Sequence, residues 1–199
     1  MYWLDKDILG ITAAALGGYS QLYYIFVILR GRARPHMFSF LIWGTVMGIA
    51  AAAQWSAGAG AGVWWTTVSA LGCLGIALLA VFKGEKNITR SDRMALIAAF
   101  SAIPLWYATK EPLFSVLLVT TIDVVGFYPT FRKSYIRPFE ESALAFFIGG
   151  FSSFLSVLAL GAFTATTVLY PAIIAVTNAV FVSMLLWRRR ALGSTMEAV

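Results

Sequence analysis

Asp123 is the residue best suited to chemistry, because it is the only acidic side chain within any of the chain's long apolar runs. An acid near the middle of a bilayer costs roughly 2.5–3.5 kcal/mol on insertion scales, so such residues usually face the interior of a helix bundle and serve a function. No Lys, Arg or His lies at the same depth to pair with it. We therefore expect Asp123 to face an internal, partly hydrated cavity and to be neutralised by a proton or a bound cation.

Other polar side chains lie near the midpoints of apolar runs. Ser20, Gln21 and Tyr24 share a helical stripe with Gly17, at spacings i, i+3, i+4 and i+7. The other candidates at this depth are Ser152, Ser153, Thr177 and Asn178. Interhelical hydrogen bonds of such residues contribute about 1 kcal/mol each. Helix packing is the favoured interpretation for Ser152, Ser153 and Thr177. For Gln21 and Asn178, packing and ligand contact both remain open.

Aromatic and proline residues suggest where a cavity would open or bend. Trp43 and Phe146 lie about one turn inside the basic ends of their runs, and either gating or simple filling of the bundle fits them. The candidates for hinge or gate are Pro35, Pro129, Pro138 and Phe146. Trp residues concentrate at membrane interfaces, so Trp3, Trp64, Trp65 and Trp187 are predicted to be interface anchors.

The composition identifies the elements that must position these residues. Apolar residues make up 60% of the chain and charged residues 12%, whereas about 25% is usual for a soluble domain. This composition indicates a membrane protein. The net charge of +6 comes from Lys and Arg in short loops between apolar runs, which topology explains without nucleic acid. The single cysteine excludes an internal disulfide.

Seven apolar runs approach the roughly 20 residues that a membrane-spanning helix needs. They are Ile8–Leu29, Phe38–Ala57, Val63–Phe82, Met94–Ala108, Leu113–Phe131, Ala143–Ala162 and Ala165–Trp187. The predicted fold is an all-α membrane protein with seven transmembrane helices. Its expected parts are a three-helix unit at 1–82, a polar loop and linker helix at 83–109, a second three-helix unit at 110–190 and a flexible tail at 191–199.

The basic residues predict the orientation. The loops after the first, third and fifth runs, with the tail, hold three, four, three and three basic residues, which is 13 of the chain's 15. Cytoplasmic loops are rich in Lys and Arg, so the N-terminus is expected outside and the C-terminus in the cytoplasm. The expected location is the cytoplasmic membrane of a bacterium.

One charged passage occurs twice, as GGYSQLYYIFVILRGRARPHMFS from Gly17 and as TTIDVVGFYPTFRKSYIRPFEES from Thr120. With a shift of 103 positions, Arg30 coincides with Lys133, Arg34 with Arg137, Pro35 with Pro138 and Ser39 with Ser142. We expect two parallel three-helix repeats joined by the linker helix, which is one of the known plans of transporters.

The second passage, Tyr128-Pro129-Thr130 followed by Arg132, Lys133 and Ser142, resembles the loop of the SWEET and PQ-loop superfamily of seven-helix transporters. In that loop, Pro-Gln precedes a basic stretch and a serine. The resemblance implies three helices, a linker helix and three more, and Asn178 resembles the family's substrate-contacting asparagine.

The leading hypothesis is a transporter for a sugar-like or other small polar solute, working by alternating access at the repeat interface. The alternative is a seven-helix receptor or binding subunit without transport. No His-Asp, Cys-His or metal-ligand cluster points to an enzyme, a cofactor or a metal. The expected partners are the small-molecule substrate, protons, the lipid bilayer and further copies of the chain, and not nucleic acid.

Overall fold

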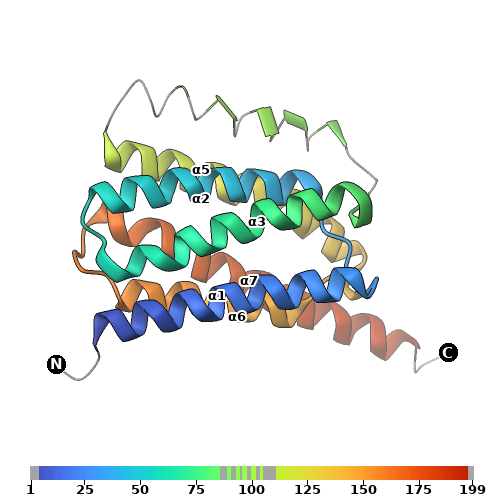
Figure 1. Cartoon of the computed structure of the whole chain (residues 1–199). Coiled ribbons are helices and arrows are strands. Elements are labelled where there is room, and N and C mark those ends of the chain that lie inside the picture. Colours follow the sequence, from blue (N-terminus) through green and yellow to red (C-terminus); the bar gives the residue numbers. More distant parts are fainter. Residues whose placement is uncertain are drawn as a thin grey trace.

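The chain is described here by a computed structural model that covers residues 5–85, 89–90, 93–94, 96–97, 100–101, 104 and 111–196. Six α-helices form within these residues, with two short 3-10 turns (Figure 1). The elements are α1 (Lys6–Leu29), α2 (Met37–Ser56), η1 (Gly60–Gly62), α3 (Val63–Lys83), α5 (Pro112–Ile136), η2 (Pro138–Glu140), α6 (Ala143–Leu158) and α7 (Ala165–Met196).

Four of the described helical segments are long and apolar enough to cross a membrane. They are Lys6–Leu29, Met37–Ser56, Gly60–Lys83 and Ala165–Leu192. Helix α6 is apolar but shorter, with 16 residues. Large apolar side chains such as Leu22, Leu71 and Leu78 are more than two-thirds exposed, as expected of side chains that face lipid. These features indicate an integral membrane protein.

The observed helices differ from the predicted runs at charged and uncharged ends. Helix α6 ends at Leu158, before the predicted end at Ala162. Helix α5 continues past Phe131 to Ile136, because the amine of Lys133 is satisfied inside the protein and need not end the helix. Helix α7 continues to Met196, so residues 191–196 are helical where a flexible tail was expected. The predicted fourth run, Met94–Ala108, lies largely outside the described residues.

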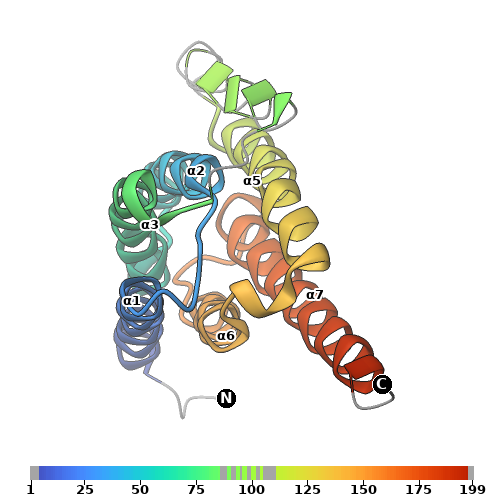
Figure 2. The same ribbon diagram turned by 90° about the vertical axis from the view of Figure 1, so that its right-hand side faces the viewer.

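The helices are arranged in two groups of three. In the first group α3 packs against both α1 and α2, and in the second α7 packs against both α5 and α6. Between the groups, α1 packs on α6 and α2 packs on α5 (Figure 2). The set of neighbours is unchanged when α1, α2 and α3 are exchanged with α5, α6 and α7. Helices α1, α3, α5 and α7 run in one direction, α2 and α6 in the other (Figure 1).

The turns α2–α3 and α6–α7 meet at one end of the bundle, near the start of α1. The amide of Gly161 donates to the carbonyl of Ala59 at 3.0 Å, and the amine of Lys6 donates to the carbonyl of Leu160 at 2.7 Å. Backbones approach closely here, since a Cβ added to Gly10 would lie 2.5 Å from the Cβ of Ala61. We call this end, formed by Lys6, residues 59–62 and residues 160–161, the turn end. The opposite end carries Arg30, Arg32, Arg34, Lys83, Arg137 and Arg188–Arg190, and we call it the basic end.

Candidate functional site

An internal cavity lies between the two groups of helices, and all six described helices contribute to its wall. Its volume for the centres of water-sized molecules is about 70 Å³, whereas a single water needs about 10–15 Å³ on that measure. The cavity can therefore hold several waters or a small solute. The side chains with polar atoms in its wall are Ser20, Gln21, Tyr24, Trp43, Trp65, Ser69, Cys73, Asp123 and Asn178.

Asp123 lies in the cavity wall, on α5, and only 1% of its surface is exposed to solvent. The hydroxyl of Tyr170, on α7, donates to its Oδ1 at 2.8 Å. Its backbone carbonyl accepts a hydrogen bond from the indole nitrogen of Trp43, on α2, at 3.4 Å. Contacts from two other helices thus fix both the backbone and the carboxyl group of this residue.

The polar residues predicted on α1 also line the cavity. Ser20 donates to the carbonyl of Ala145 on α6 at 2.6 Å, which ties the two groups of helices together. The amide of Gln21 donates to the Sγ of Cys73 on α3 at 3.6 Å. Across the cavity, the amide of Asn178 donates to the carbonyl of Ile174 at 2.8 Å, within α7.

Three of the polar residues predicted at this depth do not line the cavity, namely Ser152, Ser153 and Thr177, and the hinge candidates Pro35, Pro129 and Pro138 also lie outside its wall. Ser153 donates to the carbonyl of Pro171 at 2.7 Å, and Thr177 donates to the carbonyl of Ile173 at 2.7 Å. The Ser153 hydroxyl therefore links α6 to α7, and the Thr177 hydroxyl bonds to the backbone of its own helix.

Several residues of the site are not evident from the sequence. Trp65, predicted as an interface anchor, is 2% exposed and donates to the hydroxyl of Ser152 at 2.8 Å, so the anchor assignment is wrong for this residue. It lines the cavity with Ser69 and Cys73, and their spacing of four residues is a helical stripe that indicates a shared face. No comparable sequence pattern marks Tyr170, whose hydroxyl donates to the carboxyl group of Asp123.

An aromatic cluster lines the cavity on the side of the basic end. It consists of Tyr24, Phe40, Trp43, Phe127 and Phe146, which come from α1, α2, α5 and α6. Neighbouring ring centroids lie 4.6 Å apart for Trp43–Phe127 and 5.8 Å apart for Tyr24–Phe146. On α1 and α5, Tyr24 and Phe127 lie nearer to the basic end than Ser20 and Asp123 do.

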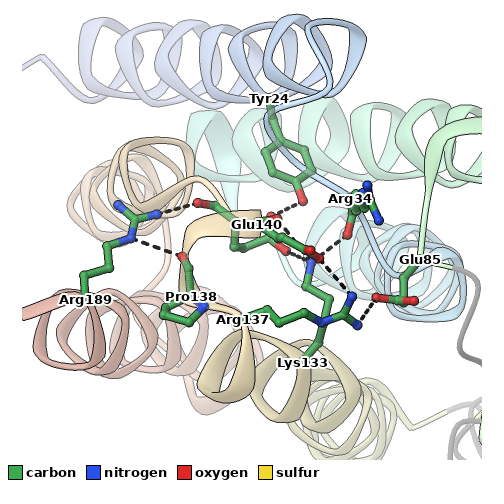
Figure 3. A network of polar contacts seen from close by, with 9 residues as sticks. Tyr24, Arg34, Glu85, Lys133, Arg137, Pro138, Glu140 and Arg189 are labelled. Carbon is green, nitrogen blue, oxygen red and sulfur yellow. Dashed lines mark hydrogen bonds and ion pairs between the residues drawn. The ribbon is translucent and has the colours of Figure 1, made fainter. Parts of the chain in front are cut away.

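Beyond the aromatic cluster lies a partly buried ionic network (Figure 3), formed by Tyr24, Arg34, Glu85, Lys133, Arg137, Pro138, Glu140, Glu141 and Arg189. The amine of Lys133 pairs with the carboxylate of Glu141 at 2.6 Å, and both side chains are buried. Glu141 also accepts a hydrogen bond from the hydroxyl of Tyr24, while Lys133 donates to the carbonyl of Arg34 at 2.6 Å. The network therefore joins the two groups of helices at the basic end.

The predicted hinge prolines belong to the surroundings of this network. The carbonyl of Pro138 accepts from Nε of Arg189 at 3.1 Å, and the carbonyl of Pro35 accepts from the amide of Glu85 at 2.9 Å. Glu85 in turn pairs with Arg137. Both prolines thus lie in the loops that the network connects, and Pro129 lies inside α5.

The arrangement suits binding of a small polar solute. Among the described residues, no three His, Cys, Asp or Glu side chains gather closely enough to hold a metal ion.

Comparisons of the chain with protein-family models, with curated proteins and with solved structures found no match.

Proposed function

We propose that the protein is a membrane transporter for a small solute and that it works by alternating access around the internal cavity. The observation that carries this proposal is the cavity itself, which combines polar and aromatic side chains, lies near the middle of the bundle and is lined by all six described helices. Substrate sites of transporters lie at this depth, between repeated units.

The packing of the helices supports a repeat. Because the neighbours stay the same when α1–α3 are exchanged with α5–α7, the two groups fit parallel units related by an axis along the membrane normal. The linker helix of this plan falls within residues 83–109. The likeness to the SWEET and PQ-loop superfamily agrees with the plan and is part of the proposal, as are the external N-terminus and the cytoplasmic C-terminus.

The two ends of the bundle are built differently, and this difference suits alternating access. At the basic end the aromatic cluster lines the cavity and the ionic network joins the two groups of helices. At the turn end the two groups meet through backbone contacts such as Gly161–Ala59. In the proposed cycle one end opens while the other remains closed.

The test is flux through liposomes that contain the purified protein. A thermal-shift panel of amines, amino acids, sugars and vitamins first selects ligands, because a ligand that binds the folded state stabilises it. Uptake of a labelled ligand is then measured in proteoliposomes and in empty liposomes. Uptake well above that of empty liposomes supports a transporter, and binding without uptake supports the alternative of a receptor.

A variant that fills the cavity provides the control. A Cβ at Gly149 would point toward the hydroxyl of Ser20 at 3.5 Å, so Gly149→Leu should occupy cavity volume and abolish uptake. Gly48 is exposed and a Cβ there would meet nothing within 4 Å. Gly48→Leu should therefore retain uptake, and equal uptake by both variants would contradict transport through this cavity.

A further inference from the structure

We propose, resting on the transporter function above, that the substrate is a small organic cation, an amine or ammonium compound without a carboxylate. The first observation is the charge of the cavity wall. Among the described residues that line the cavity, Asp123 is the only one with a formal charge, and none is Lys, Arg or His. The wall therefore offers one negative group and no positive group to a bound molecule.

The second observation is the aromatic surface next to Asp123. Six of the lining residues carry aromatic rings, namely Tyr24, Phe40, Trp43, Trp65, Phe127 and Phe146. A cation within about 6 Å of such a ring face is attracted by about 0.5–2 kcal/mol, most strongly by Trp. Trp43 contacts the backbone of Asp123 directly, so the carboxyl group and the aromatic cluster adjoin the same space.

The same wall disfavours solutes that carry a carboxylate or a phosphate. A carboxylate or phosphate would enter without a cationic partner, and a buried charge needs such a partner. The buried amine of Lys133 lies outside the cavity wall and already pairs with Glu141. This excludes zwitterionic amino acids as well as anions, since their carboxylate would face Asp123 and the rings. The cavity volume of about 70 Å³ restricts the cation to a small one.

The experiment compares three molecules of similar shape and different charge, using wild-type protein in lipid nanodiscs. Choline carries a cation, 3,3-dimethylbutan-1-ol is its neutral isostere, and glycine betaine adds a carboxylate. Calorimetric binding should be at least tenfold tighter for choline than for either of the others. Tetramethylammonium and ethanolamine are included as smaller cations, and the tightest cation is then used for uptake into proteoliposomes.

Two variants assign the preference to the cavity. Asp123→Asn keeps the shape of the side chain and should reduce the affinity for the cation at least tenfold, with little change for the neutral isostere. Asp7→Asn changes an exposed acid in the first turn of α1 and should leave both affinities unchanged. Gel filtration and thermal unfolding establish that each variant is folded, and the wild-type comparison of ligands does not depend on either variant.

The outcomes separate this inference from the proposed function. Equal or tighter binding of the neutral isostere or of betaine overturns the cation assignment, and so does failure of all three cations to bind. If an uncharged solute from the thermal-shift panel is then taken up, the protein is still a transporter. Tight cation binding without uptake supports the assignment of the ligand and overturns transport.

Discussion

Tyr170 and Asp123 form a buried pair that links α7 to α5 across the core. Tyr170 has no exposed surface, and its hydroxyl finds its partner in the carboxyl group at 2.8 Å. A tyrosine hydroxyl in an apolar core usually needs such a partner. The bond also leaves the second carboxylate oxygen outside this contact, so the pair positions the carboxyl group while retaining its capacity to bind a ligand.

Tyr170→Phe should therefore destabilise the protein and weaken binding in the cavity. Loss of the donor to a buried carboxyl group costs about 1–3 kcal/mol, which a lower thermal unfolding temperature in detergent would report. Tyr19→Phe is the matched control, because Tyr19 is 55% exposed and should tolerate the change. Equal unfolding temperatures for the two variants would show that the Tyr170–Asp123 bond contributes nothing to stability.

Much of the cavity wall can be predicted from residue type and depth alone. Ser20, Gln21 and Asp123 stood out because a polar residue halfway along an apolar run must face the protein interior. The contribution of Trp65 could not be predicted, since a tryptophan near the end of a run is more often an interface anchor. Its burial depends on α6, whose Ser152 accepts its indole hydrogen bond, and no local pattern reveals which helix is the neighbour.

At the scale of elements, the contact between α1 and the α2–α3 connection depends on Gly10. A Cβ at this position would lie 2.5 Å from the Cβ and 2.6 Å from the carbonyl oxygen of Ala61. Since one of the obstructing atoms is backbone, the helix itself would have to shift. The absence of a side chain at Gly10 therefore allows α1 to pack closely against Ala61.

Gly10→Ala should destabilise the protein by about 1–3 kcal/mol, the usual cost of overpacking. Gly48→Ala, in open space on α2, should be neutral or slightly stabilising, because alanine favours helix over glycine by about 1 kcal/mol. Thermal unfolding of the two variants in the same detergent measures the difference. A Gly10→Ala variant as stable as Gly48→Ala would rule out the close approach of α1 to Ala61.

Helix positions were predicted more accurately than helix ends. The apolar runs located α1, α2 and α3 to within a few residues, because hydrophobic length is itself the signal. The ends of α5 and α7 were missed for a physical reason. Charged residues such as Lys133 and Arg189 can extend a helix when partners outside the helix satisfy them. The carbonyl of Arg34 accepts from Lys133 and the carbonyl of Glu141 accepts from Arg189, and both partners lie far from the donor in the sequence.

At the scale of the whole molecule, the two ends differ in charge. The basic residues of the loops and tail, 13 of 15, predict that the basic end faces the cytoplasm. A reporter fused after Val199 should therefore be inaccessible from outside intact cells, and a tag before Met1 should be accessible. An external C-terminal reporter would overturn the topology, and termini on the same side of the membrane would contradict the parallel arrangement of the repeats.

The ionic network is predicted to keep the basic end closed. Glu141→Gln leaves the buried amine of Lys133 without its charged partner, and breaking a buried pair costs about 3–5 kcal/mol. Opening can be followed at Cys73, the single cysteine of the chain, which lines the cavity. A membrane-impermeant thiol reagent applied at the basic end should label Cys73 several-fold faster in this variant.

Tyr24→Phe is the milder second variant, because it removes only the hydrogen bond to Glu141 and should increase labelling to a smaller extent. Asp7→Asn, at the other end of α1, should label at the wild-type rate. Unchanged labelling in folded Glu141→Gln and Tyr24→Phe would mean that the network does not restrict access to the cavity.

The single carboxyl group in the cavity wall also has an electrical consequence. With Asp123 ionised, an organic cation makes the loaded cavity neutral, while the empty cavity carries one negative charge. A transmembrane voltage of 100 mV acts on one elementary charge with about 2.3 kcal/mol. In the proposed transport cycle, voltage should therefore act on the return of the empty cavity and leave the loaded step unchanged. The current recorded across a planar bilayer would then report the step that carries no substrate.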